Sequence, residues 1–277
     1  MKKKLLAALF AVIGSTSAMA AALPWTVNEL AVDTATGGNL VQTLGTILNR
    51  PTTFSVNNMS LVYEAVITQG AFNQQGIATF NETGRVQLSN YYTGYVPDGV
   101  TQGTAVSSAL GTAYSLWATF SVSGTAQVSG NQLFVNVSSG SFNAFADFAP
   151  NGESLSQLDA DAVVGSATTV APGGGAVLTN VGNNAAGNGS FEIVWNDFSR
   201  SGFGSNLWPA PTPFHMMLDI NSDVDGIEGA FLPGGTVANS GGQGNAYYAS
   251  VPEPSMLGLL GLGLLGAGLS SRKRKSV

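Results

Sequence analysis

In residues 114–128, every second residue is apolar or small. This pattern limits the possible fold more than any other part of the chain. The alternating positions are Tyr114, Leu116, Ala118, Phe120, Val122, Gly124, Ala126 and Val128, and the residues between them are polar except Trp117. Successive side chains of a β-strand point to opposite faces, so a period of two predicts a strand with one buried face. The turn-forming residues Ser129, Gly130 and Asn131 follow, and Leu133, Val135 and Val137 then resume the alternation. The pattern predicts an antiparallel hairpin.

Four other segments have the composition of β-strands and are separated by turn-forming residues. They are residues 61–67, 77–88, 191–195 and 214–220, and Glu82-Thr83-Gly84 is predicted as a turn inside the second of them. No convincing amphipathic helix is found between residues 21 and 251. Several strands divided by Gly, Asn and Ser turns predict an all-β fold with an antiparallel β-sandwich-like body.

Composition divides the chain into a body at residues 21–232 and flanking segments. Within the body, residues 151–189 are poor in large apolar side chains and contain Pro172-Gly173-Gly174-Gly175, so they are predicted as a long loop or insertion with at most one short strand. Residues 233–250 contain Pro233-Gly234-Gly235 and Ser240-Gly241-Gly242. This composition predicts a flexible tether between the body and the C-terminal segment, residues 251–277.

The first 20 residues have the order of parts found in a secretory signal peptide. Three lysines follow Met1, an apolar run extends to Ile13, and a stretch of small residues ends in the A-x-A box of Ala18 and Ala20. The pattern predicts a helical signal peptide that the secretion translocon accepts and signal peptidase removes after Ala20. An ordinary buried N-terminal helix is the alternative.

The C-terminal segment has three ordered parts. Pro252-Glu253-Pro254 comes first, residues 255–271 contain no charge, and the basic cluster Arg272, Lys273, Arg274 and Lys275 follows. A helix over the uncharged residues would be about 25 Å long, slightly less than the hydrocarbon core of about 30 Å. Basic residues after a span favour a cytoplasmic C-terminus. These parts predict a single transmembrane helix that anchors the exported chain in the inner membrane.

This ordered tail resembles the PEP-CTERM sorting signal of Gram-negative bacteria. The resemblance implies recognition by exosortase, a membrane-embedded cysteine protease or transpeptidase, and a role alongside exopolysaccharide in biofilms and flocs. A plain membrane anchor is the alternative. Body residues 114–120 and 189–214 are similar to segments of flocculation-associated PEP-CTERM proteins. That similarity implies a role in cell aggregation and carries over no catalytic residue.

The charge of the mature body excludes several functions. Of the ten basic residues, seven lie in the two ends, so residues 21–251 keep three arginines against 15 carboxylates, a formal charge of −12. A body of this sign repels phosphate backbones, which argues against nucleic acid and against anionic lipid surfaces as partners of the body. The chain has no cysteine, so disulfides, thiol catalysis and cysteine-based metal sites are excluded.

One cluster of oxygen-bearing residues follows a predicted strand and suggests a metal site. Its members are Asp219, Asn221, Asp223, Asp225 and Glu228, with Gly226 placed to help a turn. Calcium needs six to eight oxygen ligands, which such a turn can partly supply. An EF-hand would need Glu where Leu232 stands, so the pattern departs from that motif. The alternative is a solvated acidic turn.

Two other residues, Trp117 and His215, are candidates for a functional role. Trp117 occupies the polar side of its predicted strand, so a sugar-stacking or partner-binding role is one interpretation and burial under a loop is the other. His215 is the only histidine, and the chain has no G-x-S-x-G motif, so a structural role for His215 is favoured over a catalytic triad.

These features predict an exported, non-enzymatic matrix or surface protein. Exosortase would process its tail after a transient stay in the inner membrane, and the protein would then act with exopolysaccharide at the cell surface or in the extracellular matrix. A carbohydrate-binding or calcium-dependent adhesion module is the alternative function. A secreted polysaccharide-active hydrolase is a third.

Overall fold

The computed structural model describes residues 22–96, 101, 103–129, 132–150, 154–168, 170, 175–179, 188–195, 197–211, 216–223 and 236–249. Most of them belong to one antiparallel sheet, whose long strands are β4 (Asn58–Gln69), β5 (Ile77–Thr93), β7 (Ser115–Ser129), β8 (Gln132–Asp147) and β14 (Thr236–Ala249). Its shorter strands are β1 (Ala22–Leu23), β6 (Thr104–Ala105), β9 (Ala162–Ala167), β10 (Gly175–Thr179), β11 (Asn188–Trp195), β12 (Ser199–Arg200) and β13 (Met216–Asp223). The all-β, antiparallel class predicted from the sequence is confirmed.

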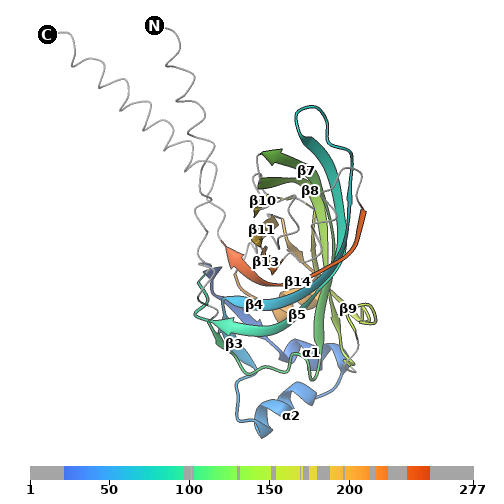
Figure 1. Ribbon diagram of the computed structural model, residues 1–277. Helices are drawn as coiled ribbons and strands as arrows, with labels where there is room; N and C mark the ends of the chain where they lie inside the picture. Colours follow the sequence, from blue (N-terminus) through green and yellow to red (C-terminus); the bar gives the residue numbers. More distant parts are fainter. Residues whose placement is uncertain are drawn as a thin grey trace, which may run out of the picture.

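The sheet curls until it meets itself. Its strand order is β10-β11-β13-β14-β4-β5-β7-β8-β9-β12, and β10 pairs with β8 as well as with β11. The first part of β8, at Gln132–Asn136, holds β10, and the later part, at Phe142–Ala146, holds β9. The predicted sandwich is therefore made by one curled sheet, and opposite parts of that sheet face each other across a shared core (Figure 1).

The apolar side chains at alternate positions of β7 pack into this core. Leu116, Ala118, Phe120 and Val122 are all buried. Gly124 occupies the next alternate position. The backbone of the adjacent strand lies so close to it that an added Cβ would collide with the carbonyl oxygen of Asn136. Antiparallel pairing continues from Ser115–Asp147 to Ser129–Gln132. The predicted hairpin is thus confirmed.

A smaller unit covers one end of the curled sheet. It contains the two-stranded sheet of β2 (Trp25–Asn28) and β3 (Thr53–Val56), and the helices α1 (Leu30–Thr36) and α2 (Leu40–Ile47). A third helix, α3 (Gly202–Leu207), begins after Ser201, whose Oγ accepts a hydrogen bond from Gly204 N at 2.9 Å. The view that the body contains no helix was wrong. These helices have six to eight residues, too few for a clear helical period.

Three further sequence predictions need correction. Glu82-Thr83-Gly84 is not a turn, because β5 runs through it without interruption. Residues 151–189 are not one long loop, because they include β9 and β10. The tether predicted at residues 233–250 is largely a strand, since β14 is paired with β13 on one side and β4 on the other.

No helix within the described part of the chain is long and apolar enough to cross a membrane. The predicted span at residues 255–271 and the predicted signal peptide lie outside the described residues.

Candidate functional site

Trp117 lies under a loop and not on an open face. Its side chain is 5% exposed, and its Nε1 donates a hydrogen bond to the carbonyl oxygen of Asp159 at 2.8 Å. Leu155 and Leu158 of the same loop pack against the indole, and the Phe145 ring lies 4.7 Å from it, centroid to centroid. Of the two interpretations of Trp117, burial under a loop is confirmed, and the sugar-stacking or partner-binding role finds no exposed ring face.

Arg85 holds the same loop from the neighbouring strand. Its Nη1 donates to the carbonyl oxygens of Leu155 at 3.2 Å and Ser156 at 3.1 Å, and its guanidinium carbon lies 5.1 Å from the centre of the Trp117 ring. A cation over an indole face is attracted by the ring quadrupole. Arg85 and Trp117 thus serve to fix residues 154–161, and the indole offers no open stacking face for a sugar.

The residues predicted to bind calcium are only partly within the described chain. Asp219, Asn221 and Asp223 occupy alternate positions of β13, and they do not form the turn expected for them. Alternate residues of a strand are about 7 Å apart, whereas a calcium ion lies about 2.4 Å from each ligand oxygen. Asp225 and Glu228, like His215, lie outside the described residues.

The register brings another carboxylate opposite Asp219. Glu192 of β11 pairs with Asp219, which pairs on its other side with Asn245 of β14, and Asn245 in turn pairs with Ser60 of β4. Opposite residues of antiparallel strands share a face and lie about 5 Å apart. The backbone register therefore places two acidic residues at opposite positions, with Asn245 and Ser60 at the corresponding positions of the next two strands. Sequence reasoning missed Glu192 as a partner because the two strands are distant in sequence.

A second polar position lies at Asn58, beside this row. Asn58 is 1% exposed, and its Nδ2 donates to Oδ1 of Asn245 at 2.8 Å. Its own Oδ1 is buried and has no hydrogen-bond partner in the described structure. Among the described side chains, no group of three or more His, Asp or Glu residues is placed to hold a metal ion.

Glu82 is a buried carboxylic acid on the core side of β5. It is 8% exposed, and its register partners on the two adjoining strands are the buried apolar residues Ile67 and Val122. Burial among these residues raises the pKa of Glu82 from 4.5 to about 7. The carboxyl is therefore mostly protonated below neutral pH in the folded protein.

Replacing Glu82 with Gln should make the protein less sensitive to pH. The pKa of Glu82 is higher in the folded than in the unfolded chain. The contribution of Glu82 to the free energy of unfolding is therefore fully present below pH 4.5 and is lost as the pH rises through 7. The shift corresponds to a change on the order of 3 kcal/mol in the free energy of unfolding. Urea unfolding at pH 5 and pH 8 should show Glu82→Gln to be more stable than the natural protein at pH 8 only. The exposed Glu64→Gln on β4 is the control, and an equal gain there would contradict the assignment.

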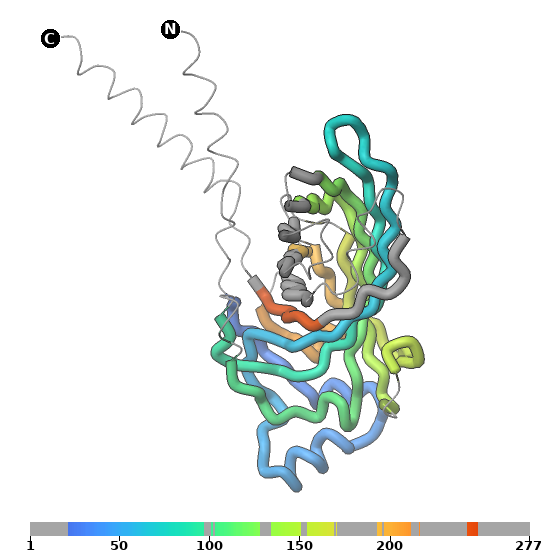
Figure 2. Tube along the Cα trace, in the orientation of Figure 1, coloured from blue at the N-terminus to red at the C-terminus, as the bar shows by residue number. Residues whose placement is uncertain are grey.

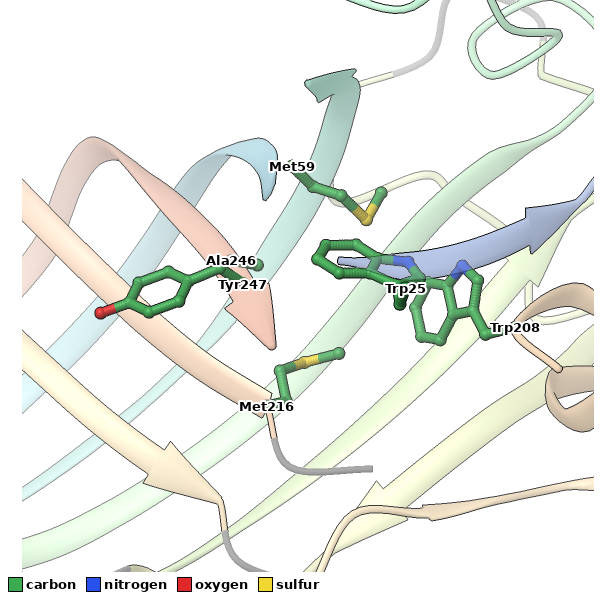
Figure 3. Close-up of a pocket in the computed structure, with 6 residues that line it drawn as sticks. All are labelled: Trp25, Met59, Trp208, Met216, Ala246 and Tyr247. Atoms are coloured by element: carbon green, nitrogen blue, oxygen red, sulfur yellow. The ribbon is translucent and has the colours of Figure 1, made fainter. Parts of the chain in front are cut away.

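A small apolar cavity lies within the described structure. Its volume is ≈ 10 Å³, and it is lined by Trp25, Met59, Trp208, Met216, Ala246 and Tyr247. Figure 3 shows the two methionine side chains directed toward the two indole rings, while the Tyr247 hydroxyl points away from them. A space of this size holds about one water molecule. It is too small to admit a sugar ring.

A buried network of polar side chains joins the helical unit to the sheet, and sequence reasoning did not identify it. Glu29 is 0% exposed, and its Oε2 lies 2.6 Å from Nη1 of Arg50. Its Oε1 accepts hydrogen bonds from Ala109 N at 2.7 Å and from the Tyr114 hydroxyl at 2.9 Å. The Tyr91 and Tyr114 hydroxyl oxygens are 3.2 Å apart, and burial raises the pKa of both tyrosines. The two hydroxyls therefore stay protonated.

This network is enclosed by protein, and among the described residues its one link to the small apolar cavity is Trp208, whose Nε1 donates to the Tyr91 hydroxyl at 3.5 Å, so its geometry favours a structural role. Glu29, Tyr91 and Tyr114 are each 0% exposed. A substrate would need to displace the helical unit to touch the carboxylate.

The tail of the chain matches a known sorting motif. Residues 250–275 match the model of the PEP-CTERM protein-sorting motif. The chain therefore carries the sorting signal of PEP-CTERM proteins, as the resemblance of its tail predicted. The motif implies that the chain is exported by the secretion machinery, held at the membrane by its tail and processed by exosortase.

No curated protein and no solved structure matches the chain. The similarity of the body to flocculation-associated proteins is thus not shown by these comparisons. The motif residues Pro252, Glu253, Pro254 and 272–275, and the cleavage-box residues Ala18 and Ala20, lie outside the described part of the structure.

Proposed function

We propose that the protein is a non-enzymatic matrix or surface protein that acts in flocculation or biofilm aggregation together with exopolysaccharide. The observation that carries the proposal is the sorting motif directly after a body whose described residues form one large buried apolar cluster. The role of such sorting signals alongside exopolysaccharide supports the choice of partner. The formal charge of −12 in the body implies that bridging to an acidic glycan requires divalent cations or contacts with neutral groups.

A deletion strain of the native host tests this proposal. It should settle more slowly or form altered biofilm while its yield of secreted polysaccharide stays unchanged. Settling measured with and without a chelator then separates cation-dependent bridging from other contacts. A collapse of polysaccharide yield together with settling would contradict the proposal and favour a biosynthetic or export role. Release of reducing sugar by the purified body would favour a hydrolase.

The proposed mature protein begins near Ala21 and ends near Pro254. This expectation combines the A-x-A box at Ala18 and Ala20 with the position of Pro252-Glu253-Pro254. Intact-mass measurement of protein isolated from the host gives both ends at once. A mass that still includes the basic cluster at residues 272–275 would show that the tail is not removed.

A calcium-dependent adhesion or carbohydrate-binding module is the second candidate function. The register of Glu192 opposite Asp219 supports it, because two like charges on opposite positions destabilise a sheet unless a cation or proton joins them. In this proposal calcium binds at that row and not at a turn.

Calcium should raise the melting temperature if it binds there. A ligand present at 100 times its Kd stabilises the native state by about 2.7 kcal/mol. Asp219→Asn should remove this gain, whereas Glu64→Gln, which changes an exposed carboxylate on β4, should preserve it. Identical melting curves in millimolar calcium and in chelator would exclude the site.

A further inference from the structure

Both ends of the folded body leave it at one place. Ala22 pairs with Ala249 and Leu23 with Tyr248, so β1 and the end of β14 are adjacent antiparallel strands. The chain before Ala22 and the chain after Ala249 therefore leave on the same side. We call this region, made of residues 22–24, 92–96 and 247–249, the exit corner.

The connection from the exit corner to the membrane anchor is short. β14 extends to Ala249, and the matched sorting motif begins at residue 250. Five residues separate Ala249 from the uncharged span predicted to begin at Ser255. At 3.6 Å or less per residue, they reach about 18 Å at most.

This connection cannot easily become longer by fraying of β14. Its end pairs with β13 and β1 at Tyr248, and with β4 at Ala246. Tyr247 is 1% exposed, and its ring centre lies 5.5 Å from that of Tyr95 in the loop after β5. Releasing even three residues would expose this aromatic pair and break pairing inside the sheet.

The chemistry of the exit corner suits a lipid surface. Residues 22–24, 92–96 and 247–249 contain no charged side chain, although the body has a formal charge of −12. Val96 is 48% exposed, and Pro24 is also exposed. The corner can therefore approach lipid headgroups without the repulsion or the desolvation cost that a carboxylate would bring.

We propose that the exit corner rests on the lipid surface while the uncleaved tail anchors the protein. This inference depends on the anchored state implied by the sorting signal and is independent of the role in flocculation. The helix α2 ends at the exposed apolar residue Ile47, and the exposed Leu48 follows it. Figure 2 shows α2 at the bottom of the body, below the side at which residues 22 and 249 lie, with the β4–β5 hairpin at the end opposite to α2. The short connection keeps α2 directed away from the membrane.

Site-specific fluorescence quenching tests this orientation. The chain has no cysteine, so Val96→Cys and Ile47→Cys in the full-length protein each accept one nitrobenzoxadiazole label. Both side chains are largely exposed, at 48% and 70%, which makes the pair well matched. The labelled proteins are inserted into vesicles of phosphatidylethanolamine and phosphatidylglycerol that contain lipids with nitroxide headgroups.

We expect several-fold stronger quenching at position 96 than at position 47. Equal quenching, or stronger quenching at position 47, would overturn the proposal and place the apolar face of α2 on the membrane. Because the vesicles contain no exosortase, weak quenching at both positions would also overturn it, and would favour a protein partner for the corner. Flotation of the vesicles shows separately whether the tail is inserted. Protein that does not float refutes the anchored state itself, and the docking with it.

A longer connection provides the second variant. Ten Gly and Ser residues inserted after Ser250 should reduce quenching at position 96 to near the level at position 47, because the flexible linker releases the body. Quenching that is unchanged by the insertion would overturn the claim that the short connection sets the orientation.

Discussion

A chain that ends after Gly235 should fail to fold, whereas one that ends after Val251 should fold as the full body does. The difference is β14, which pairs with β4 from Thr236–Thr68 to Ala246–Met59 and with β13 from Asn245–Asp219 to Tyr248–Met216. Its removal would leave the long strand β4 and the shorter strand β13 without their shared partner in the middle of the sheet. It would also remove the buried side chains of Tyr247 and Tyr248 from the core.

The expected loss exceeds what a domain of this kind can tolerate. Native proteins are stable by only about 5–15 kcal/mol. Each buried backbone N–H or C=O group that loses its partner in the sheet adds its own cost, so the loss of a whole strand exceeds this margin. Thermal unfolding followed by circular dichroism should show a cooperative transition for the chain that begins at Ala21 and ends at Val251. The chain that ends at Gly235 should show none. A cooperative transition in the shorter chain would mean that residues 236–249 are the flexible tether predicted from the sequence.

The strands with clear alternation could be predicted because burial of one face leaves a direct mark on the sequence. β7 and β8 show that mark, and their hairpin was predicted with its turn. β14 does not show it, because Ser240-Gly241-Gly242 and Gly244 supply few side chains to alternate. Pairing with β4 and β13 decides the conformation there, so neighbouring strands override local composition.

Side-chain positions depended on partners distant in sequence and were less predictable. The period of β7 placed Trp117 on the face opposite Phe120, but not under residues 154–161, which cover it. The tripeptide Glu82-Thr83-Gly84 has turn composition, yet it lies within β5. Glycine is needed at position 84 because the neighbouring strand comes so close that a Cβ would collide with the carbonyl oxygen of Glu64. Local sequence patterns thus predicted the strands, but they did not predict which distant segments pack against those strands.

The Glu29 network is the clearest case of a feature with no sequence pattern. Glu29 reaches Arg50, Ala109 and Tyr114, which are 21, 80 and 85 residues away. Three segments must fold together before the carboxylate has its partners. The network therefore reports on the docking of the helical unit against the sheet, and its removal should be among the most damaging single changes.

Glu29→Ala should reduce the free energy of unfolding by about 3–5 kcal/mol, the usual cost of removing one partner from a buried ion pair. The variant leaves the Arg50 guanidinium, whose side chain is 4% exposed, without its carboxylate. Nε and Nη2 of Arg50 already have no hydrogen-bond partner in the described structure, so little else can offset the buried charge. It also removes the acceptor of Ala109 N and of the Tyr114 hydroxyl.

A double-mutant cycle separates the charge pair from the other contacts of Glu29. Arg50→Met removes the cation and keeps much of the apolar volume, so Glu29→Gln with Arg50→Met should lose less stability than the two single changes added together. Urea unfolding of the chain that begins at Ala21 and ends at Val251 measures all four corners of the cycle. Additive losses would show that Glu29 and Arg50 do not stabilise each other. A loss below 1 kcal/mol for Glu29→Ala would contradict the buried network itself, because a desolvated guanidinium without its carboxylate must cost more than that.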